Sequence, residues 1–266
     1  MTASRSQRVV IWILVGLALV VLSAPTVVVL GASLTSGNII TFPPDGLSLK
    51  WYAKLAQAAD LRDAFLRSLW VASICTAVAL PVGTLAGIAL AKFRLRFENA
   101  LQIYLLLPFT IPLIGSGIGL MLVFGEWRVL GQLWPVGIAC AAINLPFMIW
   151  AVSASAGALN DDLELAAASC GAGRVQTFVH VTLPAVLPGV ITGSLLMFIL
   201  ALNEFLVSLL LTDARIVTLP VQIYNSIRSI ITPDLAAVSV VFIACAAVAI
   251  AVLDRVVGLD IFLKSK

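Results

Sequence analysis

Side chains that could do chemistry are concentrated in two places in this 266-residue chain. Residues 160–184 form a polar, glycine-punctuated segment that contains Glu164 and the only histidine, His180. Further along, Asn203 and Glu204 interrupt a long apolar run. A single histidine with no acidic or cysteine neighbours at ligand spacing argues for a loop residue rather than a metal ligand or a catalytic base. We therefore expect neither an enzyme nor a metal site.

Cysteine and glycine patterns also argue against chemistry carried out by this chain. The four cysteines (Cys75, Cys140, Cys170 and Cys245) show no CxxC or other ligand spacing, which favours small packing residues. The sequence contains no GxxxxGK[ST] motif, so it has no P-loop for ATP. We expect no cofactor bound by this chain.

The polar segment 160–184 has the pattern of a helix start. Residues 160–162 (Asn-Asp-Asp) can accept hydrogen bonds from the unpaired N–H groups of a first helical turn, which also contains Glu164. Ala166–Ala168 are strong helix formers with little bulk. The segment therefore predicts a short helix over Leu163–Ser169 with a narrow, alanine-rich face.

A turn and a second helix are expected to follow. Gly171 and Gly173 permit a sharp turn, and Arg174–Val181 is the second helix candidate. Leu183 and Pro184 should end that helix, because proline disfavours helical geometry in the residue before it. Two interpretations remain open: the helix–turn–helix enters a groove on a partner protein, or it is an ordinary amphipathic connector on a membrane surface.

Glu204 lies within an apolar stretch, where an ionisable group is costly and usually faces a cavity or a partner. Asn203 beside it could share a site by hydrogen bonding. One interpretation is a pathway group that attracts a cationic solute. The other is a charge near the exterior end of a membrane span that is paired or reaches water. The sequence leaves both open.

The composition indicates which elements must position these groups. Hydrophobic residues make up 61% of the chain and charged residues 11%, whereas a soluble domain has about 25% charged residues. Runs of about 20 apolar residues can cross a bilayer as helices. We predict an all-α, polytopic membrane protein with six transmembrane helices. The expected spans are Val9–Leu34, Leu66–Ala91, Leu101–Phe124, Val129–Ser155, Ala185–Leu211 and Leu235–Leu253.

The first and third spans have distinctive features. The first is longer than the apolar region of a typical signal peptide, so we expect an uncleaved helix. In the third, Pro108 and Pro112 break the backbone ladder, and Gly115, Gly117 and Gly119 follow. Lining of a pathway or subunit interface and close packing through small residues both remain open for this span.

The charge distribution sets the expected orientation. Six spans place both termini on one side, and the basic loop with Lys92, Arg94 and Arg96 puts that side in the cytoplasm. The loop at 35–63 would then be exterior, with an interfacial helix over Leu49–Ala64. A net charge of +3 is too small to indicate a nucleic-acid partner.

The segment 164–184 resembles the EAA loop of binding-protein-dependent ABC-transporter permeases. That pattern is EAA, three residues, glycine, nine residues, isoleucine, any residue and Leu-Pro. The residues that match it, with valine for isoleucine, are Ala166, Ala167, Gly171, Val181, Leu183 and Pro184. Leu165 occupies the position of the motif's glutamate, and the acid stands one place earlier, at Glu164.

The resemblance extends along the chain. Segments that look like parts of the second permease subunit of spermidine/putrescine-type importers are FPPDGLSLKWY (Phe42–Tyr52), LPFTIP (Leu107–Pro112), NEFLVSLLLT (Asn203–Thr212) and TLPVQIYNSIR (Thr218–Arg228). This resemblance implies the type I ABC importer permease fold in a bacterial inner membrane. The implied function is to form half of the pathway for a small solute, with a polyamine or related compound expected.

The resemblance also implies partners and residue roles. The partners are a second homologous permease subunit, two ATP-binding subunits that hold ATP and Mg, an exterior (periplasmic) solute-binding protein and the lipid bilayer. Glu164 and the matching motif residues would couple to the ATPase, while Glu204, Asn203 and Pro112 would belong to the solute pathway. The alternative is a secondary transporter in which Glu204 couples an ion.

We expect three parts along the chain. Residues 1–63 form the first transmembrane helix and the exterior loop. Residues 64–257 form a core permease domain of five transmembrane helices, with the ATPase-docking loop at 160–184. Residues 258–266 form a cytoplasmic tail.

Overall fold

The computed structural model describes residues 5–93, 96–213, 215–229 and 232–257. Regular secondary structure in these residues is helical, apart from one isolated antiparallel bridge between Thr35 and Leu47. The all-α prediction is therefore confirmed. Arg94 and the predicted tail 258–266 lie outside the described residues.

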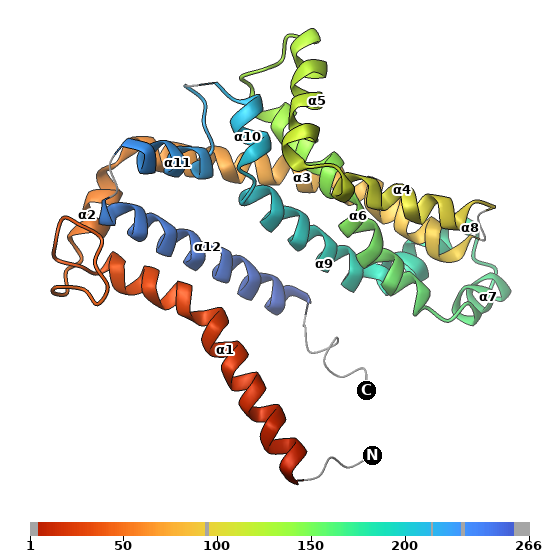
Figure 1. Cartoon of the computed structure of the whole chain (residues 1–266). Coiled ribbons are helices and arrows are strands. Elements are labelled where there is room, and N and C mark those ends of the chain that lie inside the picture. Colours follow the sequence, from red (N-terminus) through yellow and green to blue (C-terminus); the bar gives the residue numbers. More distant parts are fainter. Residues whose placement is uncertain (1–4, 94–95, 214, 230–231, 258–266) are drawn as a thin grey trace. The chain divides into compact units, whose positions relative to one another are not determined.

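Contacts divide the chain into two compact units. The first is Met1–Arg62 with Ile223–Ala247, and the second is Asp63–Gln222 with Val248–Lys266. The first contains α1 (Arg5–Ser33), α2 (Lys50–Gln57) and most of α12 (Pro233–Val257) (Figure 1).

Helix α2 is tied to its neighbours within the first unit. The indole Nε1 of Trp51 donates to the carbonyl oxygen of Thr35 at 2.9 Å, and Lys54 forms an ion pair with Asp234 at the start of α12 at 2.9 Å. The interfacial helix predicted over Leu49–Ala64 is wrong as a single element. It is interrupted because Ala58 has extended geometry (ψ 92°), and a new helix begins at Ala59.

The second unit holds the remaining helices, the first of which begins in the first unit with residues 59–62. They are α3 (Ala59–Lys92), α4 (Glu98–Thr110), α5 (Leu113–Glu126), α6 (Leu133–Gly157), α7 (Asp162–Ser169), α8 (Arg174–Thr177), the π-helical turn η1 (Phe178–Thr182), α9 (Leu183–Leu202), α10 (Leu206–Leu211) and α11 (Leu219–Ser229), which continues into the first unit.

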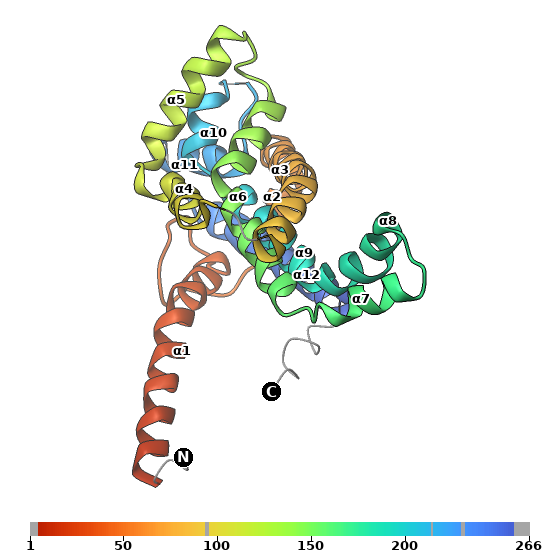
Figure 2. The same cartoon turned by 90° about the vertical axis from the view of Figure 1, so that its right-hand side faces the viewer.

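Helix α6 forms the centre of the second unit, where α9 runs beside it (Figure 2). Glycines set the helix separations: a Cβ on Gly189 of α9 would lie 2.5 Å from the carbonyl oxygen of Ala151. On the α3 side, a Cβ on Gly83 would lie 2.3 Å from Cγ of Met148. Small residues thus let the backbones approach closely, as in other helix–helix contacts in membranes.

The number of membrane-length helices is lower than the six predicted. Four described helices are long and apolar enough to cross a bilayer, and five if the bent pair α4 and α5 counts as one span. The sixth expected span, Leu235–Leu253, falls within α12, a helix of 25 residues, of which the stretch Pro233–Val248 is apolar. The polytopic prediction is confirmed, whereas the count of six is not.

The third predicted span, Leu101–Phe124, is divided into two helices, so the break in the backbone ladder predicted at Pro112 is confirmed. Helices α4 and α5 meet at an angle of 93°. The break falls at Ile111, which has extended geometry (φ −87°, ψ 129°), and at Pro112, which precedes the first residue of α5. This follows from the restriction that proline places on the residue before it. Pro108, in contrast, lies inside α4 without ending it.

The fourth and fifth predicted spans differ from the observed helices at their ends or within them. The fourth span corresponds to α6, which begins at Leu133 and not at Val129, because Arg128 (φ 56°) and Gly131 (φ 78°) adopt left-handed geometry and form a turn. The interruption predicted in the fifth span is confirmed, since α9 ends at Leu202 and α10 begins at Leu206.

Candidate functional site

The segment 160–184 begins with the predicted helix start. Oδ1 of Asn160 accepts a hydrogen bond from the backbone N–H of Asp162 at 3.0 Å. Asp162 and Glu164 lie in the first turn of α7, where the positive end of the helix dipole favours acidic groups. The local sequence therefore accounts for the position at which α7 begins.

The turn after α7 depends on Gly171. Its φ is 84°, a left-handed geometry that L side chains rarely adopt, and the N–H of Ala172 donates to the carbonyl oxygen of Ala167 at 3.1 Å to close the helix end. Gly173 has φ −72° and ψ 165°, an extended geometry open to any residue. Of the two glycines in the predicted turn, the backbone requires only the first.

The prediction that Leu183 and Pro184 end the second helix is wrong. Helix α8 continues through η1 into α9, so Arg174–Leu202 is one helical stretch of 29 residues. The N–H of Leu183 donates to the carbonyl oxygen of Phe178, five residues earlier. This wider turn directly precedes Pro184, the second residue of α9, and such a local π-helical turn accommodates a proline inside a continuous helix. The polar segment is therefore continuous with a membrane helix.

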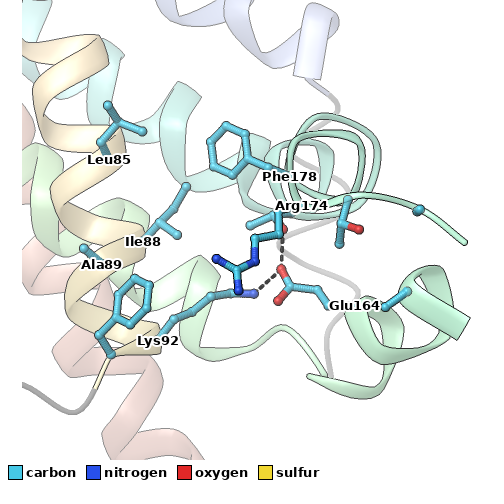
Figure 3. Close-up of a pocket in the computed structure, with 12 residues that line it drawn as sticks. Leu85, Ile88, Ala89, Lys92, Glu164, Arg174 and Phe178 are labelled. Carbon is cyan, nitrogen blue, oxygen red and sulfur yellow. Dashed lines mark hydrogen bonds and ion pairs between the residues drawn. The ribbon is translucent and has the colours of Figure 1, made fainter.

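Glu164 joins three elements of the second unit, as Figure 3 shows. Its Oε1 accepts a hydrogen bond from Nζ of Lys92, the last residue of α3, and another from Oγ1 of Thr182 in η1. The first of these contacts is also an ion pair. The side chains of Lys92 and Glu164 are 16% and 28% exposed, and Thr182 is 3% exposed. Water therefore has limited access to this contact.

The electrostatics favour the ionised pair. The pKa of the Glu164 carboxyl is lowered, first because Lys92 donates a hydrogen bond to it and second because Thr182 does, with burial opposing the shift. Lys92 lies in the last turn of α3 and Glu164 in the first turn of α7. Each charge is therefore also at the helix end whose dipole favours it.

A pocket of about 480 Å³ adjoins this contact. Figure 3 shows Arg174 extending toward the same polar end, while Leu85, Ile88 and Phe178 form an apolar wall. Arg174 makes no ion pair or side-chain hydrogen bond in the part of the chain that the structure describes.

The outward side of the segment is apolar. The side chains of Leu163, Leu165, Val175 and Val179 are exposed, with Leu165 at 64% and Val175 at 77%. Thus the acid at 164 is turned toward the membrane helices, whereas the leucine at the motif's glutamate position faces outward.

The other predicted coupling residues lie along the same segment with no further bonds between their side chains. Ala166, Gly171 and Pro184 are exposed, and Ala167, Val181 and Leu183 are half-buried. What brings the two halves of the segment together is the Glu164–Thr182 hydrogen bond.

The predicted pathway residues lie elsewhere in the second unit. Oε1 of Glu204 accepts a hydrogen bond from the N–H of Val207 at 3.0 Å, in the first turn of α10. Asn203 donates to the carbonyl oxygen of Ile199 at 2.9 Å. Pro112 precedes α5, and α5 packs on α10. Among the described residues no hydrogen bond links Glu204, Asn203 and Pro112 to one another.

Two residues of the site were missed by sequence reasoning. Lys92 entered only as part of a basic loop, and Thr182 occupies a position that the motif leaves free. The sequence did contain a signal for Lys92. It is a cation at the end of a long apolar run, on the same side of the membrane as the acidic segment was expected to lie. For Thr182, nothing in the sequence indicated a side chain turned toward α7.

The helices, the bent pair and the ordered polar segment define a polytopic membrane protein. Residues 79–259 match the family described as binding-protein-dependent transport system inner membrane components. The chain belongs to this family, and it is thus a permease of the ABC importer type. Membership argues against the secondary-transporter alternative.

Several relatives cover most of the chain. It is 26% identical over 225 residues to the putrescine transport system permease protein PotI of Escherichia coli K12, covering 82% of this chain and 80% of that protein. It is 31% identical over 205 residues to the molybdenum transport system permease protein ModB of Mycobacterium bovis, covering 71% and 77%. The spermidine/putrescine permease PotC of Haemophilus influenzae is 26% identical over 212 residues, covering 80% and 82%.

The Glu164 contact predicts a pH dependence of stability. A lowered pKa in the folded state means that the stabilisation is fully present above the usual carboxyl value of 4.5 and is lost as the pH falls below it. The other charged side chains that line the adjoining pocket are Lys92 and Arg174. We expect Glu164→Gln to cost about 1 kcal/mol at neutral pH.

The measurement is the melting temperature of the purified importer at neutral pH and well below pH 4.5. The difference between wild type and Glu164→Gln should disappear at the lower pH. Glu126→Gln, which changes an exposed acid of α5, is the control and should show no such difference. An unchanged difference at both pH values would contradict the assignment.

Proposed function

We propose that this chain is the permease subunit of an ATP-driven importer for a polyamine or related solute, and that residues 160–184, the docking segment, couple it to a separate ATPase. The continuity of this segment with membrane helices carries the proposal. Residues Arg174–Leu202 form one helical stretch, and Glu164 contacts the end of α3. A displacement of the docking segment would therefore reach two membrane helices directly.

The outward surface of the docking segment supports a protein partner. Leu163, Leu165, Val175 and Val179 expose apolar side chains in a loop that we place in the cytoplasm, and an exposed apolar patch indicates an interaction site. Ala166 and Ala167 add little bulk, so α7 could enter a groove. Gly171, Val181, Leu183 and Pro184 complete the proposed coupling element, and the chain would depend on two ATP-binding subunits that hold ATP and Mg.

The rest of the assembly follows from the same proposal. A second homologous permease subunit would complete the pathway, and a periplasmic solute-binding protein would deliver the solute to its exterior face. ATP-driven closure of the ATPases would then switch the pathway between outward- and inward-open states. Both termini would be cytoplasmic, with residues 1–63 preceding a core at 64–257 and a tail at 258–266.

A cationic solute is supported by the environment of Glu204. One carboxylate oxygen caps α10 through Val207, and the second makes no hydrogen bond among the described residues, so it could face a cation. The names of the relatives specify putrescine, spermidine and molybdenum. A carboxylate in the pathway would attract a cationic amine such as putrescine or spermidine and would repel an anionic solute. Asn203 and Pro112, near the ends of α9 and α5, would lie along the same pathway.

The two glycines of the turn give a direct test of the docking segment. Gly171→Ala places a side chain at φ 84°, which costs about 1–2 kcal/mol, so the turn should distort and the importer should take up less putrescine per ATP hydrolysed. Gly173→Ala is the matched control. An added Cβ meets nothing within 4 Å at either position, so only the backbone differs. The same putrescine uptake per ATP hydrolysed in both variants would contradict the docking assignment.

Putrescine uptake also tests the proposed solute and Glu204. Removing the charge in Glu204→Gln should raise KM about tenfold, which corresponds to about 1.4 kcal/mol of lost attraction for the cation. The glutamine can still cap α10, so the fold should persist, and Glu126→Gln should transport normally. Unchanged kinetics in Glu204→Gln would make this acid structural. Failure of the intact importer to take up putrescine would contradict the polyamine proposal.

A further inference from the structure

We propose that Lys92 and Thr182 are positioning residues that act through Glu164, so that α7, the end of α3 and the start of α9 move as one body. We call these three residues the brace. The inference rests on the coupling role proposed for residues 160–184, and it assigns the displaced acid of the motif to an internal contact instead of the ATPase surface.

The bonding pattern of the brace constrains α7 in two directions. A single oxygen of Glu164, Oε1, accepts from Lys92 at the end of α3 and from Thr182 before α9. One hydrogen bond would let the side chain pivot, whereas two bonds from different elements fix the carboxylate relative to both. The low exposure of Thr182 (3%) keeps water from replacing its bond.

The position of the acid at residue 164 explains why its side chain points toward α3. Successive residues of a helix point about 100° apart, so residues 164 and 165 cannot both face α3. Here Leu165 is 64% exposed and Glu164 is bonded inward. An acid at 165 would therefore leave Lys92 without this partner.

Thr182 behaves differently from Thr76 in α3 and Thr192 in α9. Oγ1 of Thr76 donates to Ala72 at 2.8 Å and Oγ1 of Thr192 donates to Pro188 at 2.9 Å, in both cases to the backbone four residues earlier. Thr182 instead donates to Glu164 from within the π-turn η1. Such turns are frequent at functional sites, and this one directs a hydroxyl from the start of a membrane helix to the docking segment.

The brace can be tested by spin-label distances in the assembled importer. Cys170, exposed at the end of α7, and a cysteine in place of Val82, on an exposed part of α3, carry the labels. Cys245→Ala removes the other cysteine that is not buried. Wild type should give the same narrow α7–α3 distance distribution with and without bound ATP.

Breaking the brace should release α7. Glu164→Gln and Lys92→Met should broaden the distribution by about twofold or more, because α7 would then be held mainly by its turns. Thr182→Val should have a smaller effect, and Lys92→Arg should keep the narrow distribution. Lys54→Met, which breaks an ion pair of the first unit, is the control. The broadened variants should take up less putrescine per ATP hydrolysed while the ATPase still copurifies.

Three results would overturn the inference: a wild-type distance that shifts when ATP binds, a narrow distribution in Glu164→Gln, or normal coupling in variants whose distribution has broadened. Failure of the docking proposal would give a different result from failure of the brace. In that case Gly171→Ala would transport normally, whatever the spin labels report. A brace that fails alone leaves Gly171→Ala uncoupled and Glu164→Gln coupled.

Discussion

The carboxylate of Glu164 joins elements that are distant in the sequence. Lys92 precedes it by 72 residues and Thr182 follows it by 18. Without this contact, α7 would be held by the turns on either side of it and by its packing on α8 and η1. With it, the polar face of α7 is directed toward α3 and α9, and the apolar side chains of Leu165 and Val175 remain outside. The direction of the docking segment thus follows from one ion pair and one hydrogen bond.

Helix α9 gives this contact a mechanical consequence. It begins directly after Thr182 and ends at Leu202, next to Asn203 and Glu204. Its 20 residues span about 30 Å, which is the thickness of a bilayer's hydrocarbon core. The same helix therefore runs from the segment that we propose contacts the ATPase to the acid that we propose contacts the solute. Close contacts at Gly189 hold α9 against α6 along the way.

Local patterns predicted the local features well. The start of α7, the left-handed Gly171 and the break after Leu202 all follow from residue types that favour a cap, a turn or an interruption. The prediction that Pro184 ends its helix failed, because a π-turn accommodates the proline within one continuous helix. The break at Pro112 was predicted, but its 93° angle was not. The partners of Glu164 are distant along the chain, and spacing within one segment carries no information about them.

The most direct test of the account is site-specific photocrosslinking in the assembled importer. A photoreactive residue at Leu165 or Val175, on the outward apolar face, should crosslink to the ATPase subunit. The same residue at Leu122, which is exposed on the membrane helix α5, should not. Crosslinks from Leu165 and Val175 that reach only lipid or other parts of this chain would contradict the claim that residues 160–184 form the docking surface.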